Sequence, residues 1–132
     1  MARYAMQTTL PGSLAEVKPR VVEALKAHGY GILTEIDVQA TLREKLGVDF
    51  EPYLILGACN PQLAYGALTA ERTIGLLLPC NVVLREVGDE VEVSLLDPLV
   101  MFEVTEPATQ AALGDLPHEA RRRLEAALQD LK

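Results

Sequence analysis

The residues best suited to chemistry are two Cys-Asn pairs, Cys59-Asn60 and Cys80-Asn81. The chain has only two cysteines, and each of its two asparagines directly follows one of them. A proline adjoins each pair, as Cys59-Asn60-Pro61 and Pro79-Cys80-Asn81. Thiol and amide groups in this arrangement are suited to holding a small ligand or anion, to nucleophilic chemistry, or to packing in a core. The four residues are therefore the candidate ligand-binding residues.

The first pair is expected where a strand ends and a helix begins. Asn60 suits the N-cap of a helix and Pro61 its first position. The positive helix end there favours a bound anion or a thiolate at Cys59. Cys80 is expected at the start of a later strand, so both thiols approach one site if the two strands are neighbours. Thiol chemistry would require Cys59 to react first, with an apparent pKa below about 7.5. Burial behind the apolar run 54–58 is the competing effect, because desolvation raises the pKa of a thiol.

The other candidates have simpler structural explanations. His28 and His118 share no zinc-ligand spacing with the cysteines, so no metal site and no cofactor are predicted. Glu35 and Asp37 lie on one side of an expected strand as a carboxylate pair, but Asp37 is better explained as the N-cap of the next helix. The basic run 121–123 cannot share one helical face, so it is interpreted as solvated surface.

Turn and capping residues divide the chain into alternating elements. Ser13 and Glu16 have the spacing of a capping box, and Gly29 suits the helix end. Pro19 either kinks this first helix or starts it near Lys18. The remaining pattern predicts strands over 3–9, 31–36 and 53–59, a hairpin over 82–86 and 90–96, and helices over 38–46, 61–68 and 117–131.

This order favours one α+β domain over residues 1–132. We expect a two-layer sandwich, with a mixed or mostly antiparallel sheet and helices mainly on one face. Strand 53–59 is apolar on both sides, which suggests a central position. The strand order and the path of residues 99–116 stay open.

Composition narrows the classes of partner. The 132 residues carry a formal net charge of −7, which disfavours nucleic acid and membrane surfaces as partners. The longest apolar run, Ile74 to Cys80, is too short to span a bilayer, and the first residues lack the apolar segment of a signal peptide. A cytoplasmic protein with reduced thiols is expected. Many prolines and few asparagines are compatible with a heat-adapted source.

Strand alternation predicts an exposed apolar sheet face. Val83 points opposite to Val82 and Leu84, and Leu96 points opposite to Leu95. If helices cover one face, apolar groups remain on the other. A second copy of the chain would cover them, so a homodimer is expected.

Several segments together resemble the domain-of-unknown-function family numbered 302, found in bacteria and archaea. The resemblance runs in order from about Ser13 to Asp97-Pro98 and is weak after Met101. It implies a compact α/β sandwich that tends to pair as a homodimer, and it implies no activity and no catalytic residue. The Cys-Asn pairs match family motifs whose role is open. The segments that carry it are GYGILTEID (29–37), KLGVDF (45–50), LGACNP (56–61) and IGLLLPCNV (74–82).

Three functions remain in competition. The leading hypothesis is a non-enzymatic, cytoplasmic, homodimeric binding module for a small molecule, an anion or a protein partner. The second is a thiol-dependent redox or transfer protein that uses Cys59 and Cys80. The third is a purely structural or interaction domain.

Overall fold

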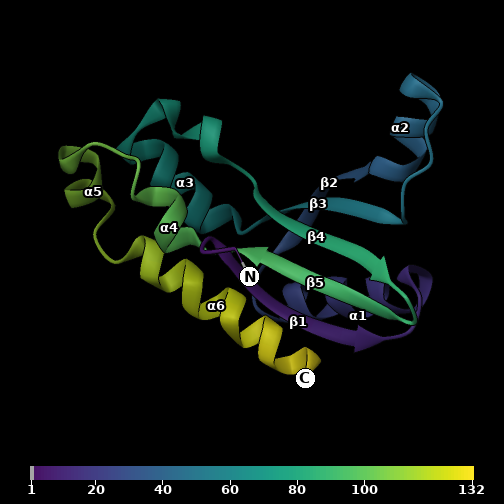
Figure 1. Cartoon of the computed structure of the whole chain (residues 1–132). Coiled ribbons are helices and arrows are strands. Elements are labelled where there is room, and N and C mark those ends of the chain that lie inside the picture. The colour runs from purple at the N-terminus through teal and green to yellow at the C-terminus, as the bar shows by residue number, and fades with distance from the viewer. Residues whose placement is uncertain (1) are drawn as a thin grey trace.

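The fold is built on one five-stranded sheet, which a computed structural model describes within residues 2–132. Every neighbouring pair of strands is antiparallel, and the order across the sheet is β1-β5-β4-β3-β2 (Figure 1). Central β4 and its neighbour β5 form the predicted hairpin. The strands are β1 (Ala5–Pro11), β2 (Gly31–Asp37), β3 (Tyr53–Cys59), β4 (Cys80–Val87) and β5 (Glu90–Leu96).

The helices lie mainly on one face of this sheet. The long helices α1 and α6 pack against each other and against the strands, and Figure 1 shows α1 behind β1 and β5. The predicted α+β fold, with helices mainly on one face, is confirmed. The helices are α1 (Leu14–Ala27), α2 (Val38–Leu46), α3 (Pro61–Ala70), the 3-10 helix η1 (Arg72–Leu77), α4 (Pro98–Phe102), α5 (Pro107–Leu113) and α6 (Leu116–Leu131).

The core lies between the sheet and helices α1 and α6. Alternate residues of each inner strand enter it, as Val82 and Leu84 of β4 show with no exposed surface. Val21 of α1 and Leu124 of α6 meet these strands from the helical layer. Because burial of such side chains supplies most of the stabilisation of a domain, this layer fixes how the strands lie.

Local signals place the start of α1 as predicted. Ser13 is the N-cap, and the capping box with Glu16 is complete in both directions. Pro19 lies inside the helix, which begins at Leu14 and runs through it. A start near Lys18 is therefore wrong, because the cap at Ser13 and the buried residues Val17 and Val21 hold the turn before the proline.

Two predictions about the strands differ from the structure. The first strand runs from Ala5 to Pro11 rather than from residue 3 to 9, because β5 pairs with it as far as Pro11. Strand β3 is interior, but β4 is the central strand. Apolar residues on both sides of β3 indicate that the strand has neighbours on both sides and is covered on its faces. These conditions also apply to an interior strand that is not the middle one.

The open segment 99–116 forms two short helices and their connections. Asp97 caps α4 by accepting from the amide of Leu99 at 2.9 Å. Helix α5 starts at Pro107, and Gly114 follows its end with φ +57°. These helices extend the helical layer beyond the ends of the strands, near α3 (Figure 1).

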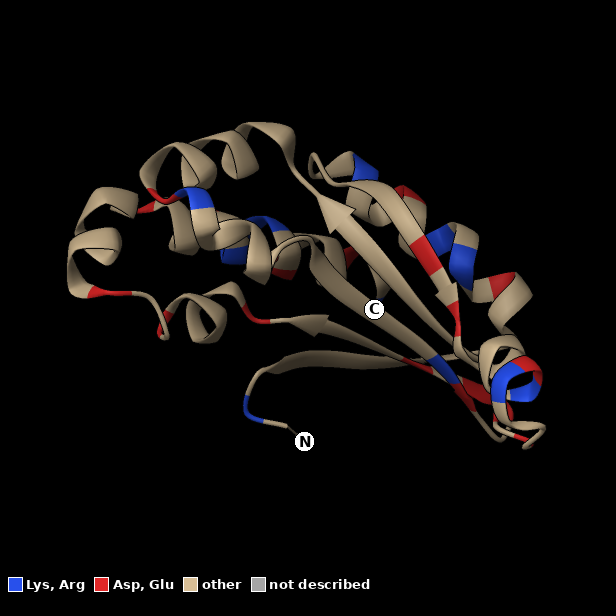
Figure 2. Ribbon diagram, turned by 90° about the horizontal axis from the view of Figure 1, so that it is seen from above, with Lys and Arg blue, Asp and Glu red and all other residues tan. Residues whose placement is uncertain are grey.

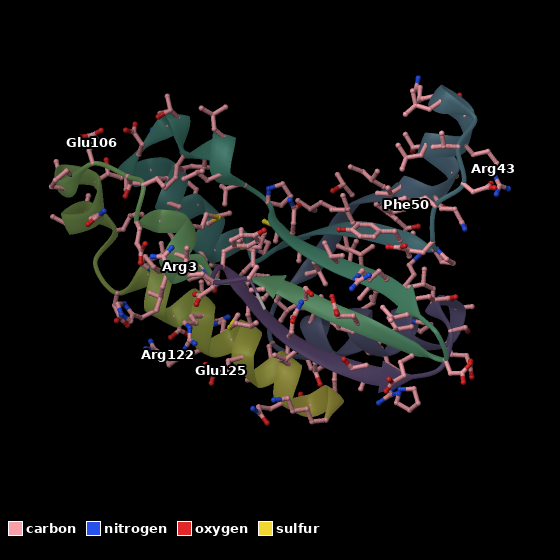
Figure 3. All side chains as sticks on the ribbon, in the orientation of Figure 1. Arg3, Arg43, Phe50, Glu106, Arg122 and Glu125 are labelled. Atoms are coloured by element: carbon pink, nitrogen blue, oxygen red, sulfur yellow. The ribbon has the colours of Figure 1, made fainter. Side chains whose placement is uncertain are left out.

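Helix α2 projects from the other end of the sheet. Asp37 caps it by accepting from the amide of Ala40 at 2.9 Å, and Gly47 ends it with φ +65°. None of its residues is buried, and Leu46 is 69% exposed. Figure 3 places Arg43 of this helix and nearby Phe50 away from the α3–α6 end of the molecule.

The second face of the sheet is open over much of its area. Side chains on this face are half-buried or exposed, including Ile55, Val83 and Leu96. Figure 2 shows acidic and basic residues interspersed along the helices, whereas the strands are mostly uncharged over much of their length. The predicted exposed apolar groups are therefore present.

Candidate functional site

The structure brings both cysteines to one end of the sheet. Cys59 is the last residue of β3 and Cys80 the first of β4. Ala58 lies directly opposite Cys80 in the register of these strands, so the two cysteines are diagonal neighbours. Both line the same pocket. The structure therefore places the two thiols close together, as expected for neighbouring strands.

Asn60 lies between β3 and α3, at the N-cap position that an asparagine there predicts. Its Oδ1 accepts from the backbone N–H of Leu63 at 3.0 Å, which caps α3, and Pro61 occupies the first helical position. The side chain is one of few buried polar groups, with 5% of the residue exposed. Asn60 also lines the pocket that the cysteines share.

Asn81 does not join the other three candidates. It is exposed and lies on the open face of the sheet, opposite Gly57 of β3. Successive side chains of a strand point to opposite faces, so Cys80 enters the pocket and Asn81 turns away from it. Asn81 lines a separate shallow depression with Val83 and Ser94.

The shared pocket is small and mainly apolar. It offers about 30 Å³ to the centres of water molecules, which is room for about two of them. A larger occupant requires its walls to move, and Met101 is a side chain that adapts readily. The lining residues are Tyr30, Ala58, Cys59, Asn60, Leu63, Ala64, Ala67, Leu78, Pro79, Cys80, Met101, Phe102, Leu116 and Ala120.

The electrostatics of the pocket oppose thiolate formation. Burial raises the pKa of the Cys80 thiol to about 11, and the nearby Cys59 adds to this. Burial also raises the pKa of Cys59 above its ordinary value. The low thiol pKa that the helix end favoured for Cys59 is therefore not supported, because desolvation of the charged sulfur outweighs the small effect of the helix end.

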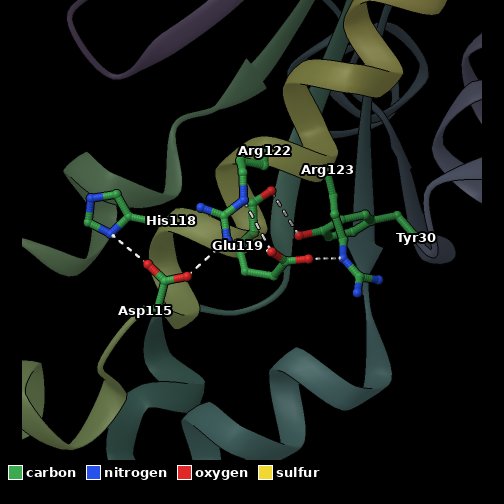
Figure 4. Close-up of polar contacts among 7 residues, drawn as sticks. Tyr30, Asp115, His118, Glu119, Arg122 and Arg123 are labelled. Atoms are coloured by element: carbon green, nitrogen blue, oxygen red, sulfur yellow. Dashed lines mark hydrogen bonds and ion pairs between the residues drawn. The ribbon is translucent and has the colours of Figure 1, made fainter.

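Two further residues belong to this region and were missed as site residues. Tyr30 is 3% exposed, and its hydroxyl donates to the carbonyl of Ala120 at 3.5 Å. Burial raises the pKa of Tyr30 above its usual range. Figure 4 shows Arg123 of α6 beside Tyr30, with its Nε donating to Glu119. The sequence signals were the Gly-Tyr-Gly motif at 29–31 and the arginine run, neither of which indicates a partner across the fold.

The remaining candidates make polar contacts elsewhere. His28 contacts Asp130 at 2.7 Å, and His118 lies 3.9 Å from Asp115. Glu35 pairs with Lys18 across β2 and α1 at 2.5 Å. Within residues 2–132, no group of three or more potential ligands is placed to hold a metal ion.

The arginine run separates into different contacts. Arg121 pairs with Asp97 and Glu125, whereas Arg122 and Arg123 both contact Glu119. The interpretation of a solvated surface describes Arg122, which is 59% exposed at its side chain. It does not fully describe Arg123, which turns toward Tyr30 and the N-terminus of α3.

The architecture and pocket define a small α+β protein with an antiparallel sheet. Its overall structure is similar to the crystal structure of an uncharacterised conserved protein, DUF302, from Bacillus stearothermophilus. The two share 28% sequence identity and a TM-score of 0.86, with 99% of this chain and 100% of the other covered.

The sequence comparison agrees with the structural one. The model of the family described as "Domain of unknown function DUF302" matches residues 6–131. The chain belongs to this family, as the resemblance in its motifs indicated. A search of the curated proteins finds no match.

Proposed function

We propose that the protein is a homodimeric binding module for a small ligand, with its site at the pocket shared by Cys59, Asn60 and Cys80. The observation that carries this proposal is the pocket itself, which combines apolar walls with a buried amide side chain. Ligand pockets in proteins are typically apolar with a few placed polar groups. The raised thiol pKa values favour binding over the alternative of thiol-dependent redox or transfer chemistry.

A cytoplasmic location is part of this proposal, because two cysteines with the spacing of Cys59 and Cys80 do not form a secreted disulfide framework. Cys59 and Cys80 are free thiols, the usual state in a reducing compartment. No helix of residues 2–132 combines the length and apolar character needed to cross a bilayer.

Filling the pocket should abolish small-ligand binding. Ala64 lines the pocket from α3, and Ala64→Leu adds a branched side chain there. Phenol, indole and cyclopentanol serve as neutral probes, with amide chemical shifts of pocket residues as the measurement. We expect saturable shifts in the unmodified protein and at least a tenfold weaker response in the variant.

Thr69→Leu is the matched control for this experiment. Thr69 lies on the same helix but is exposed and outside the pocket. This variant should bind the probes as the unmodified protein does. Pocket shifts that are absent in the unmodified protein, or equal in Ala64→Leu, would contradict the site and favour a purely structural domain.

The open sheet face supports pairing with a second copy. Val83 and Leu96 are half-buried on this face, and Ile55 lies opposite Val83 on β3. A two-fold interface would remove these groups from water on both copies at once.

A charge in this face should convert the dimer to a monomer. Val83→Glu places a carboxylate at the centre of the proposed interface, where burial of an unpaired charge is costly. Sedimentation equilibrium at micromolar concentration should show a dimer for the unmodified protein and a monomer for this variant. Gln62→Glu adds the same charge at an exposed position of α3 and should remain dimeric. A monomeric unmodified protein would rule out the interface.

A further inference from the structure

The pocket that Cys59 and Cys80 share has an uncharged lining. Among residues 2–132, no aspartate, glutamate, lysine, arginine or histidine lines it. Its titratable groups are Tyr30 and the two thiols, which are neutral in their ordinary state at neutral pH. Burial raises the pKa of all three groups, so the surroundings disfavour charge. A ligand that enters this pocket is therefore expected to be uncharged.

The hydroxyl of Tyr30 lies at the α6 side of this pocket. Tyr30 stands in the connection between α1 and β2, where its backbone N–H donates to the carbonyl of Leu25 at 2.9 Å. Its hydroxyl donates to the carbonyl of Ala120 on α6 at 3.5 Å (Figure 4). Ala120 also lines the pocket, so the polar end of the tyrosine ring is beside the pocket.

The oxygen of Tyr30 can accept a further hydrogen bond. A phenolic hydroxyl has one proton to donate and lone pairs that accept. The proton is directed to Ala120, and no donor to this oxygen occurs among the hydrogen bonds of residues 2–132. The bond to Ala120 is long for a hydroxyl donor. A ligand that donates to Tyr30 would polarise the hydroxyl and strengthen this bond.

The other polar side chains of the pocket are weaker acceptors for a ligand. Asn60 uses its Oδ1 to cap α3, accepting from the N–H of Leu63 at 3.0 Å. The thiols of Cys59 and Cys80 form only weak hydrogen bonds. Tyr30 is therefore the side chain best suited to accept from a polar group inside the pocket.

We propose that the pocket selects small uncharged molecules that carry a hydroxyl group, and that the oxygen of Tyr30 accepts the hydrogen bond from this hydroxyl. This inference rests on the proposed binding function and names the chemical class of its ligand. The apolar part of the ligand lies against Leu63, Ala67 and Phe102, where the adaptable side chain of Met101 makes room for it.

Phenol and toluene test this proposal because they have nearly the same shape and differ in the hydroxyl group. Each is titrated into the full chain at neutral pH, where phenol is uncharged, and amide chemical shifts of pocket residues give the two dissociation constants. Benzoate reports the response to a charged ligand. Tyr30→Phe removes only the hydroxyl. Tyr53→Phe removes a hydroxyl at the other end of β3, outside the pocket, and is the matched control.

We expect the preference for phenol over toluene to fall by about tenfold or more in Tyr30→Phe, because the phenol hydroxyl then enters the pocket without a partner. Toluene should bind this variant within about twofold of its normal affinity, because it loses no hydrogen bond. Tyr53→Phe should leave both affinities unchanged. Benzoate should give no saturable shift of pocket amides.

An unchanged preference in Tyr30→Phe, an equal fall in Tyr53→Phe or saturable binding of benzoate in the pocket would overturn this inference alone and leave the proposed function in place. If Tyr30→Phe does not bind toluene, the unmodified protein decides. Its preference for phenol would support the Tyr30 contact, whereas a preference for toluene is the order expected without an acceptor and would overturn it. No saturable shift with either phenol or toluene would overturn the proposed function as well.

Discussion

Replacing Gly57 with alanine should lower the free energy of unfolding by about 2 to 3 kcal/mol. Gly57 lies in β3, two residues before Cys59, and a Cβ there would lie 2.7 Å from Cγ of Pro79 and closer still to the hydroxyl of Thr34. The Thr34 hydroxyl can rotate away about χ1, but the Pro79 ring is rigid and directly precedes β4, which pairs with β3. The new methyl group would therefore turn the Thr34 side chain and force β3 away from Pro79 at the start of β4.

Gly31→Ala is the matched control for this prediction. Gly31 also lies in a strand, with no positive φ, and a Cβ there would meet nothing within 4 Å. Its substitution should change the free energy of unfolding by less than about 1 kcal/mol, in the stabilising direction if the unfolded chain loses entropy. Urea unfolding of both variants measures the difference.

A second substitution separates the two contacts. Thr34→Ala removes the hydroxyl that would be nearest to the new methyl group but leaves the Pro79 ring in place. The double variant should therefore recover only part of the stability lost in Gly57→Ala. Equal stability of Gly57→Ala and Gly31→Ala would show that the strands do not approach as closely as described.

The capping residues were predictable because their partners lie within one helical turn. Ser13 with Glu16, Asp37 with Ala40, and Asn60 with Leu63 all bond across three residues. Such contacts depend on local spacing and residue type alone. The starts of α1, α2 and α3 follow from them, and so does the position of Cys59 at the end of a strand.

The order of strands was not predictable from the same patterns. β1 pairs with β5 from the far part of the chain, so β5 lies between the first strand and its hairpin partner. The alternation of apolar and polar residues shows which face of a strand is buried, but it does not show which strand lies beside it. The sequence leaves the pairing of β3 with β4 open, so it predicts that the two thiols meet only if these strands are neighbours.

At the candidate site, too, positions set by neighbouring residues were predictable from the sequence, whereas contacts between distant segments were not. Asn81 follows Cys80 within a strand, and alternation alone places their side chains on opposite faces. Asn60 lies just after β3 ends at Cys59, so strand alternation does not place the side chains of Cys59 and Asn60 on opposite faces. Arg123 reaches the N-terminus of α3 only because α6 packs against α3. The arginine run in the sequence does not indicate this packing.

The stability of the protein should fall more steeply above pH 8.5 than that of Cys80→Ala. Cys80 is 8% exposed, and burial, with a contribution from nearby Cys59, raises its pKa to about 11. An unfolded thiol has a pKa of about 8.5. Between these values the unfolded chain loses this proton while the native chain keeps it.

The sign of the effect follows from that difference in bound protons. The native state binds the Cys80 proton more tightly, so the stabilisation is fully present below about pH 8.5 and is lost as the pH rises toward about 11. The loss amounts to about 2 to 3 kcal/mol over this interval. Alanine has no proton to lose, so Cys80→Ala lacks this dependence, although its cavity lowers the stability at every pH.

Urea unfolding at intervals between pH 7.5 and pH 10.5 measures this contribution as the gap between the two proteins. The gap should narrow by about 2 kcal/mol across the series. Tyrosine and lysine titrations occur in both proteins and largely cancel in the comparison. Cys59→Ala is the matched thiol control, and because Cys59 is more exposed than Cys80, its gap should narrow less. Parallel curves for the unmodified protein and Cys80→Ala would mean that the Cys80 thiol is hydrated in the native state, and the thiol-dependent alternative would then regain its physical basis.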